Sequence, residues 1–421
     1  MVCEKVGRKL AERRDKMLYY IKCSLMRRKA ANLVTAGISI MLVLLLNLYF
    51  GSVRSYQAQL SDLAENVPIF CQITNLNGTM GNGLFISEST VEALEGSGQV
   101  KDLSYMAVMM AGEGDFQDAE YSKHLNLYVV GANNARAVGE LTNDMIHMES
   151  QDTDAFFASD RMECIVNEKV LAKRGWKVGD RITLKCYYYD PASELHKIDI
   201  HPMGQTAEAE IMGTMEEISG KTNAISTDVV IPARAARNLF KQSGLTFFAD
   251  TVTFHVGNPL LLNDFKEEMQ NIGLMETFAE AGDSYTGCAL VVRDAEFIAS
   301  ATDLRRSIEM LQSFFPVVCI LVLLIGYVVS SLAGSSRREE FALMRLQGVK
   351  RRRAFLPFLE EQMLLVALGC LVGDAVAVAV SPVSVIVKVN GVLLLAYLIG
   401  AMAAYGQMSR KNVVSLLSIR R

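Results

Sequence analysis

Few residues of this 421-residue chain have the types and spacing that catalysis or metal binding requires. The sequence ISGKTNA at 218–224 is similar to the end of a phosphate-binding loop, but Met215 stands where that loop requires a glycine. His196 and His201, with Asp199 between them, could hold a metal ion, although two histidines five residues apart on a loop are more often solvated. The sequence contains neither a GxSxG nucleophile turn nor a helical HExxH zinc motif. We therefore expect no catalytic residue, no metal and no cofactor in this chain.

The composition indicates a membrane protein with a large water-exposed part. Apolar residues make up 51% of the chain and charged residues 21%, which is too apolar for an ordinary soluble protein and too charged for membrane spans alone. Several apolar runs approach the roughly 20 residues that a helix needs to cross a bilayer. Gly369 and Gly373 form a GxxxG pattern in one run, which would let another helix approach closely. We predict four spans, at 32–50, 313–334, 359–380 and 388–407.

Basic residues near the span ends predict the orientation of the chain in the membrane. Residues 1–31 hold ten Lys or Arg and three acids, and residues 335–353 hold seven Lys or Arg and two acids. The segment 52–310 instead holds 20 basic and 38 acidic residues, a net charge of −18. We therefore expect both termini in the cytosol and the segment 51–312 outside the cell.

The two ends of the chain are predicted to be cytosolic segments. Leu18, Ile21 and Leu25 share one face of the basic leader 1–31, which favours an amphipathic helix on the inner membrane surface. Residues 408–421 are expected to form a basic cytosolic tail.

Apolar residues at both ends of the outer segment repeat at the spacings of a short heptad pattern. Helices that continue directly from the first and second spans predict an antiparallel stalk beneath the outer domain. The alternative is that each stripe simply packs against that domain. The stripe residues are Tyr56, Leu60 and Leu63 after the first span, and Phe297, Leu304, Ile308 and Leu311 before the second.

Between the stalk helices, two similar strand–helix–strand patterns predict a split α/β lobe. They cover 68–112, where Ser87 would cap a helix over 87–97, and 249–292. The intervening residues 113–248 alternate short β-like runs with loops and are expected to form a mainly β insert. The expected fold class is therefore a membrane α-helical protein of four transmembrane helices, with a large extracytoplasmic α+β domain on a helical stalk.

Half of the eight cysteines lie in the outer segment, where disulfides could form. Cys71, Cys164, Cys186 and Cys288 allow up to two disulfides, with three possible connectivities. Each lies on an apolar, strand-like stretch, where a buried free thiol is equally compatible. Both alternatives remain open from the sequence.

The stretch that joins the second and third spans, SSRREEFALMRLQGVKRRRAFLPFLEEQMLL, is helix-forming sequence interrupted by Gly348. A glycine inside a helix costs about 1 kcal/mol relative to alanine, so we expect Gly348 to form a left-handed corner between two helices. The first of these helices is expected to bury Phe341, Leu343 and Met344. We predict a coupling helix and turn over 335–358; the alternative is an ordinary basic cytosolic loop.

The same stretch carries a family resemblance. The pattern Arg337-Arg338-x-Glu340-x-Ala342-x-x-Arg345-x-x-Gly348, followed by basic residues and FLEEQMLL, resembles the FtsX-like permease domain of MacB/LolC-type ABC transporters. The topology of one span, a large outer domain and three further spans is also similar to that family, as are GWKVGDRITL at 175–184 and RKNVVSLLSI at 410–419. The resemblance implies a coupling helix that contacts an ATPase subunit. The residues that would make this contact are Arg337, Arg338, Glu340, Ala342, Arg345 and Gly348.

By this resemblance the chain is a non-catalytic permease subunit in a bacterial cell membrane. It has no fused ATPase, so the resemblance implies a separate cytosolic ATPase chain that holds ATP and Mg, and a dimer with a second permease copy or a paralogue. The implied function is export or extrusion of a peptide, lipid-linked or drug-like substrate by mechanotransmission. The alternative is a sensor or regulator of envelope stress or of cell-wall hydrolases. The acidic outer segment would suit a cationic peptide or envelope protein, the spans would contact membrane lipid, and no feature indicates nucleic-acid binding.

Overall fold

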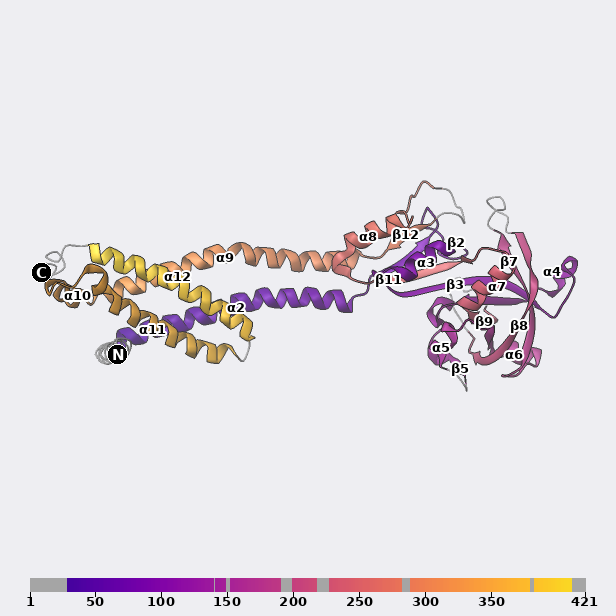
Figure 1. The fold of residues 1–421 in the computed structure, drawn as a ribbon, viewed down its shortest axis with the longest axis horizontal. Coiled ribbons are helices and arrows are strands. Elements are labelled where there is room, and N and C mark those ends of the chain that lie inside the picture. Colours follow the sequence, from indigo (N-terminus) through magenta and orange to yellow (C-terminus); the bar gives the residue numbers. More distant parts are fainter. Residues whose placement is uncertain are drawn as a thin grey trace, which may run out of the picture. The chain divides into compact units, whose positions relative to one another are not determined.

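The computed structural model describes residues 29–139, 141–148, 152–190, 199–217, 227–281, 288–378 and 382–410 (Figure 1). The predicted leader helix and most of the predicted tail lie outside these ranges. The chain divides into two compact units, which are described separately. We call Met1–Asp62 with Ser300–Arg421 the membrane unit, and Leu63–Ala299 the sheet unit.

Four helices of the described chain are long and apolar enough to cross a membrane, and each contains or overlaps one predicted span. This agreement confirms the membrane part of the expected fold class. A short helix, α10, lies between the second and third of them in the sequence. The bounds are α2 Lys29–Asn66, α9 Ala295–Ser335, α10 Arg338–Leu346, α11 Arg351–Ala377 and α12 Val383–Arg410.

The predicted GxxxG contact is confirmed, and its partner is α2. A β-carbon added at Gly369 would lie 2.6 Å from Cβ of Ser39, and one added at Gly373 would lie 2.8 Å from Cγ1 of Val43. Distances this short leave no room for a side chain at either glycine. Helices α2 and α11 therefore cross with their backbones in close approach, as small residues in membrane helices permit.

The predicted stalk residues lie on helices that extend beyond the apolar runs. Within the membrane unit, α2 and α9 contact each other where the Tyr49 hydroxyl donates to the Leu311 carbonyl oxygen at 2.6 Å. The stripe positions are buried or half-buried, whereas most of their neighbours along the helices are exposed. Five of the seven, Tyr56, Leu60, Leu304, Ile308 and Leu311, belong to the membrane unit, and Leu63 and Phe297 belong to the sheet unit.

The sheet unit is built on one ten-stranded mixed sheet, with the order β12-β1-β11-β3-β4-β9-β6-β8-β5 and with β7 paired to β3 and β8. A separate two-stranded sheet pairs β2 with β10. The strands are β1 Phe70–Thr74, β2 Ile86–Ser87, β3 Val100–Glu113, β4 Leu127–Ala132, β5 Ile146–Met148, β6 Glu163–Asn167, β7 Arg181–Asp190, β8 Asp199–Met215, β9 Val229–Pro232, β10 Phe248–Ala249, β11 Thr251–Val256 and β12 Ala289–Val292. The α-helices are α3 Glu88–Gly96, α4 Tyr121–His124, α5 Thr153–Ala158, α6 Glu168–Arg174, α7 Ala233–Gln242 and α8 Leu262–Asn271.

Both predicted strand–helix–strand patterns are present, as β1-α3-β3 and β11-α8-β12. The predicted helix cap is also confirmed, since Oγ of Ser87 accepts a hydrogen bond from the backbone N–H of Thr90. The expected division into a split lobe and an insert differs from the structure, because strands of both parts join one sheet. The reason is the length of β3, which has 14 residues: it pairs with β11 from Val100 to Met106 and with β4 and β7 from Met106 to Glu113.

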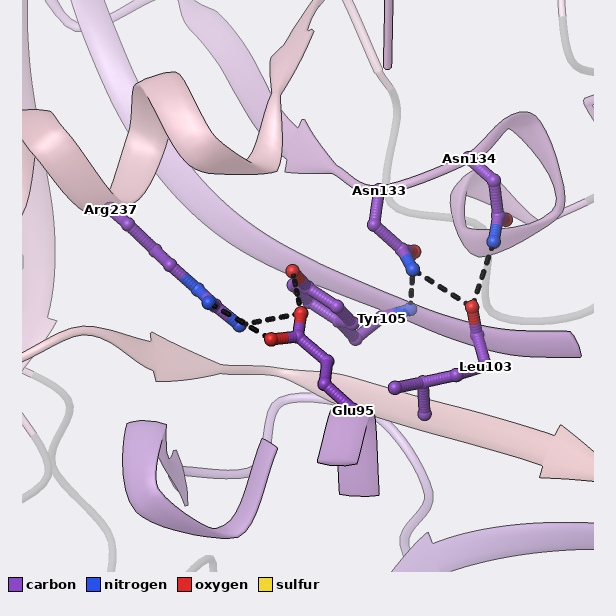
Figure 2. A network of polar contacts seen from close by, with 6 residues as sticks. All are labelled: Glu95, Leu103, Tyr105, Asn133, Asn134 and Arg237. Carbon is purple, nitrogen blue, oxygen red and sulfur yellow. Dashed lines mark hydrogen bonds and ion pairs between the residues drawn. The ribbon is translucent and has the colours of Figure 1, made fainter. Parts of the chain in front are cut away.

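A polar network ties α3, β3 and α7 together although they are distant in the sequence (Figure 2). Oε1 of Glu95 accepts from the Tyr105 hydroxyl at 2.7 Å and from Nη2 of Arg237 at 3.0 Å. The Arg237 guanidinium also lies 5.1 Å from the centre of the Tyr105 ring. On the opposite side of β3, Oδ1 of Asn133 accepts from the backbone N–H of Tyr105 at 2.8 Å. The network fixes α3 and α7 to the long strand β3.

The four cysteines of the sheet unit are free thiols in the structure. Cys71, Cys164 and Cys186 are buried on β1, β6 and β7, and Cys288 is half-buried. Burial raises the pKa of Cys71, Cys164 and Cys186 to about 12, so these thiols stay protonated and unreactive at neutral pH. Of the two alternatives left open by the sequence, the structure therefore has the free thiols.

Asp250 is a half-buried acid whose charge opposes folding. Its Oδ2 accepts a hydrogen bond from the backbone N–H of Val108 at 2.5 Å. Burial nevertheless raises the pKa of Asp250 to about 7, against about 4 in an unfolded chain. Between these two values the folded state binds more protons than the unfolded state, so this residue lowers the free energy of unfolding as the pH rises from about 4 to about 7.

We expect Asp250→Asn to stabilise the sheet unit at pH 7 by roughly 1–3 kcal/mol and to have little effect near pH 4. An asparagine Oδ1 can still accept from Val108, and it carries no charge. Urea unfolding of the full chain in detergent, followed by fluorescence of Trp176, would measure this change, because the chain's single tryptophan lies in the sheet unit. An equal difference in stability between Asp250→Asn and the wild type at pH 4 and at pH 7 would contradict a raised pKa of Asp250.

Candidate functional site

The candidate site is the corner between α10 and α11. Gly348 has a φ of 83°, which confirms the predicted left-handed corner. Its backbone N–H donates to the carbonyl oxygen of Arg345, and the N–H of Val349 donates to that of Met344, both at 3.1 Å. These two bonds form a Schellman motif, which satisfies carbonyl groups at the end of a helix and requires a residue that tolerates positive φ. Nη1 of Arg345 also donates to the Val349 carbonyl oxygen at 3.3 Å.

Helix α10 has an inward face and an outward face. Phe341 and Ala342 are buried against the other helices of the membrane unit. Leu343 and Leu346 are 57% and 64% exposed. The expectation that Leu343 is buried is therefore wrong, because it lies on the opposite side of the helix from Phe341. These two leucines, bordered by the exposed polar residues Glu339 and Gln347, form the exposed side of the helix, which we call the α10 outer face.

Arg337, just before α10, makes a buried ion pair with Glu361 of α11. Nη2 of Arg337 lies 2.7 Å from Oε1 of Glu361, and Nη1 donates to Oε2, so the contact is bidentate. The side chains are only 8% and 3% exposed. Burial disfavours the charge on Arg337, but the hydrogen bond and charge of Glu361 outweigh it, so the pKa of the guanidinium is raised above its usual value. The guanidinium of Arg337 therefore stays charged at physiological pH.

Two aromatic rings extend this contact to the last helix. The Arg337 guanidinium lies 5.5 Å from the centre of the Phe358 ring, and that ring stacks on Tyr405 of α12 with centres 6.5 Å apart. One turn further along α11, Oε1 of Gln362 accepts from the Tyr397 hydroxyl at 3.3 Å. Helices α11 and α12 pack closely against each other (Figure 1). Helix α10 is thus connected through α11 to α12.

The structure separates the six residues of the predicted ATPase contact into two groups. Arg337 and Ala342 are buried within the membrane unit, which leaves them no exposed surface for a direct contact with another chain. Arg338, Glu340 and Arg345 are half-buried and Gly348 is exposed at the corner, so these four can contribute to such a surface.

Glu361 as the partner of Arg337, and the α10 outer face, were not predicted from the sequence. An acid at the start of an apolar run is a signal that could have indicated a buried partner, since charges in membrane helices are normally paired. Its arginine lies 24 residues away, and only the folded helices bring the two together.

The possible metal ligands, and the segment that is similar to a phosphate-binding loop, gain no support from the part of the chain that the structure describes. Asp199 and His201 lie on β8, and His196 lies outside the described residues, as does 218–224. Among the described residues, no group of three or more His, Cys, Asp or Glu side chains could hold a metal ion.

The C-terminal part of the chain matches a known protein family. Residues 313–413 match the family described as FtsX-like permease C-terminal. This range includes α10, α11 and α12 in its described part. A comparison with curated proteins found no match.

Three solved structures resemble part of the chain. The periplasmic region of MacB from Actinobacillus actinomycetemcomitans has 8% identity and a TM-score of 0.30, and the match covers 56% of this chain and 92% of that one. The extracellular domain of the ABC-type transporter YknZ from Gram-positive bacteria has 16% identity and a TM-score of 0.28, covering 53% and 98%. A domain of a permease protein from Porphyromonas gingivalis, described as putative, has 13% identity and a TM-score of 0.27, covering 53% and 86%.

Proposed function

Because residues 313–413 carry an FtsX-like permease C-terminal domain, we propose that this chain is the membrane subunit of an ABC transporter that works with a separate ATPase subunit. The observation that carries the proposal is the α10 outer face. A short helix between two membrane spans exposes Leu343 and Leu346 on one side and is fixed to the spans on the other. An apolar helix face bordered by polar residues is the kind of surface that docks into a groove on a partner.

The proposed mechanism transmits force rather than performing chemistry. ATP and Mg are bound and hydrolysed in the partner, whose movement displaces α10. The buried pair of Arg337 and Glu361 carries the displacement to α11, and the contact of Phe358 with Tyr405 carries it to α12. Helices α2 and α9, which both continue beyond their apolar runs, would pass the motion toward the sheet unit.

The proposed arrangement places α10 and both termini in the cytosol of a bacterial cell and the sheet unit outside. Two copies of the chain, or one copy and a paralogue, would assemble with two ATPase subunits. The substrate would be a peptide, a lipid-linked molecule or a drug-like molecule, and the movement of the sheet units would extrude it.

We expect Leu343→Asp with Leu346→Asp to abolish co-purification of the ATPase. Two charges on the α10 outer face would remain exposed in the free subunit, but would be buried without partners in the complex. A tagged full-length chain would be isolated from detergent-solubilised membranes, and ATP hydrolysis would be measured in the eluted material. At least a tenfold loss of this activity is expected.

The matched control is Leu260→Asp with Leu261→Asp, which adds the same charges at exposed leucines of the sheet unit. This control should retain the ATPase. Equal ATPase recovery from both double variants would contradict the docking role of α10. A wild-type preparation without ATPase activity would contradict the transporter assignment itself.

A second candidate function is favoured by the charge of the outer segment. Residues 52–310 carry a net charge of −18, which would attract a cationic peptide or envelope protein. In this case the ATPase cycle would report binding as a signal and would not move a substrate. Binding of a cationic peptide that alters ATP hydrolysis without any transport into or out of proteoliposomes would favour this function.

A further inference from the structure

A cavity of about 620 Å³ in the membrane unit lies between α2, α9 and α12. Aromatic rings form one side of it, and the rings of Phe50 and Phe315 meet edge to face at 5.9 Å. Polar, basic and small aliphatic side chains form the rest. Its lining includes Tyr49, Phe50, Arg54, Phe315, Ser384 and Lys388.

The basic groups give this cavity a positive character. Arg54 and Lys388 both line it, and among the described residues around it none is acidic. Nη1 of Arg54 donates to Oγ of Ser384 at 2.7 Å, which holds the guanidinium at the rim. Asp374, near the end of α11, accepts a hydrogen bond from Asn390 at 2.7 Å and does not line the cavity.

The start of α12 adds a third positive contribution. Ser384 and Val385 lie in the first turn of this 28-residue helix and line the cavity. Helix N-termini carry about half a positive charge, and here it acts through the helix dipole, because the N–H of Val385 already donates to the Pro382 carbonyl oxygen at 2.9 Å. No acidic side chain occupies the first turn of α12 to neutralise this charge. An anion in the cavity would therefore be favoured by two side chains and by the helix end.

The cavity lies at the level of lipid headgroups. Phe50 is the last residue of the first predicted span, and Phe315 lies at the start of the second. From Phe315 to the end of α9 at Ser335, roughly 20 helical residues extend about 30 Å, which is the thickness of the hydrocarbon core. The cavity is thus on the opposite side of the bilayer from α10. Large apolar side chains of α9, including Val317, Ile320 and Leu324, are exposed just beyond it toward the middle of the span.

We propose that this cavity binds the phosphate headgroup of an anionic phospholipid from the leaflet opposite α10. Arg54, Lys388 and the start of α12 would hold the phosphate and its charge, and Tyr49, Phe50 and Phe315 would pack against the glycerol region. The acyl chains would extend along the exposed apolar side chains of α9. This site requires only that the four apolar helices span the membrane, and it does not depend on coupling to an ATPase.

The test compares two lipids on the full-length chain. After removal of bound lipid in detergent, the protein would be titrated with phosphatidylglycerol or with phosphatidylcholine, and retained lipid would be counted by native mass spectrometry. The wild type is expected to prefer phosphatidylglycerol. Arg54→Gln with Lys388→Gln should reduce this preference on the order of 10- to 30-fold, because each basic group near a lipid headgroup contributes several-fold.

Two further variants separate the cavity from general surface charge. Arg305→Gln with Arg306→Gln removes the same charge from an exposed part of α9 outside the cavity, and should leave the preference unchanged. Ala58→Phe fills space at the cavity without altering any charge, and should lower phosphatidylglycerol binding. The far-UV circular dichroism of each variant should match that of the wild type.

Four results would overturn the proposal. One is equal retention of the two lipids by the wild type, and another is an equal loss of preference in both charge-removal variants. Displacement of phosphatidylglycerol by millimolar inorganic phosphate would indicate a site for the free ion. Cross-linking of two chains through Val53→Cys, with the lipid absent, would show that a second copy fills the cavity.

Discussion

Arg337→Gln is expected to destabilise the membrane unit by about 3–5 kcal/mol, which is the typical cost of removing one member of a buried ion pair. Glutamine cannot neutralise Glu361, whose side chain is only 3% exposed, so the carboxylate would be left charged and without its partner in a low-dielectric environment. Thermal loss of the helical far-UV circular dichroism signal of the full chain in detergent would measure the effect. Fluorescence of Trp176 would show whether the sheet unit is unchanged.

A double replacement distinguishes the ion pair from simple packing. Arg337→Met with Glu361→Leu removes both charges and keeps apolar volume, and such replacements are often neutral or stabilising. We therefore expect the double variant to regain most of the stability that Arg337→Gln loses. If it folds stably but no longer stimulates ATP hydrolysis by the co-purified ATPase, the pair also transmits motion between α10 and α11. A melting temperature of Arg337→Gln equal to that of the wild type would contradict a structural role for the pair.

Gly400→Ala is expected to produce the second large effect, a destabilisation of about 1–3 kcal/mol or more from overpacking. A β-carbon at Gly400 would lie 2.4 Å from the carbonyl oxygen of Leu323 and 2.8 Å from the backbone nitrogen of Tyr327. Both are backbone atoms of α9, which cannot move aside as a flexible side chain can. Helices α9 and α12 would have to separate where they cross.

Gly391→Ala in the same helix is the matched control. A β-carbon there would meet no atom within 4 Å, and alanine is the better helix former by about 1 kcal/mol. We expect this variant to melt at the wild-type temperature or slightly above it, and Gly400→Ala to melt clearly below. Similar melting temperatures for the two variants would mean that α9 and α12 do not approach as closely as the structure shows.

The identity of most elements was predictable because it depends on neighbouring residues. Four apolar runs predicted the helices that could span a membrane, and the Ser87 cap marked the start of α3. Gly348 was identified as a left-handed corner because a helix interior disfavours glycine, and its φ of 83° agrees. Gly369 and Gly373 were identified because a four-residue spacing places both on one side of a helix.

The candidate site was only partly predictable, because the buried side of a helix depends on the helices that pack against it. The sequence located the corner between α10 and α11, but it could not show which side of α10 faces the other helices. Leu343 was therefore assigned inward, and Arg337 was assigned to a contact with another chain. In the structure Leu343 is 57% exposed, and Arg337 is paired with Glu361.

The sequence by itself determined the four long apolar helices, the two strand–helix–strand patterns and the charge asymmetry between the segments, all of which follow from local composition and spacing. The tertiary structure alone decided which distant groups meet. It paired Arg337 with Glu361, set Gly400 against the backbone of α9, and joined both predicted lobes through β3 into one sheet. The physical reason is that burial, close packing and strand pairing depend on residues brought together from far apart in the chain, and no local pattern specifies those partners.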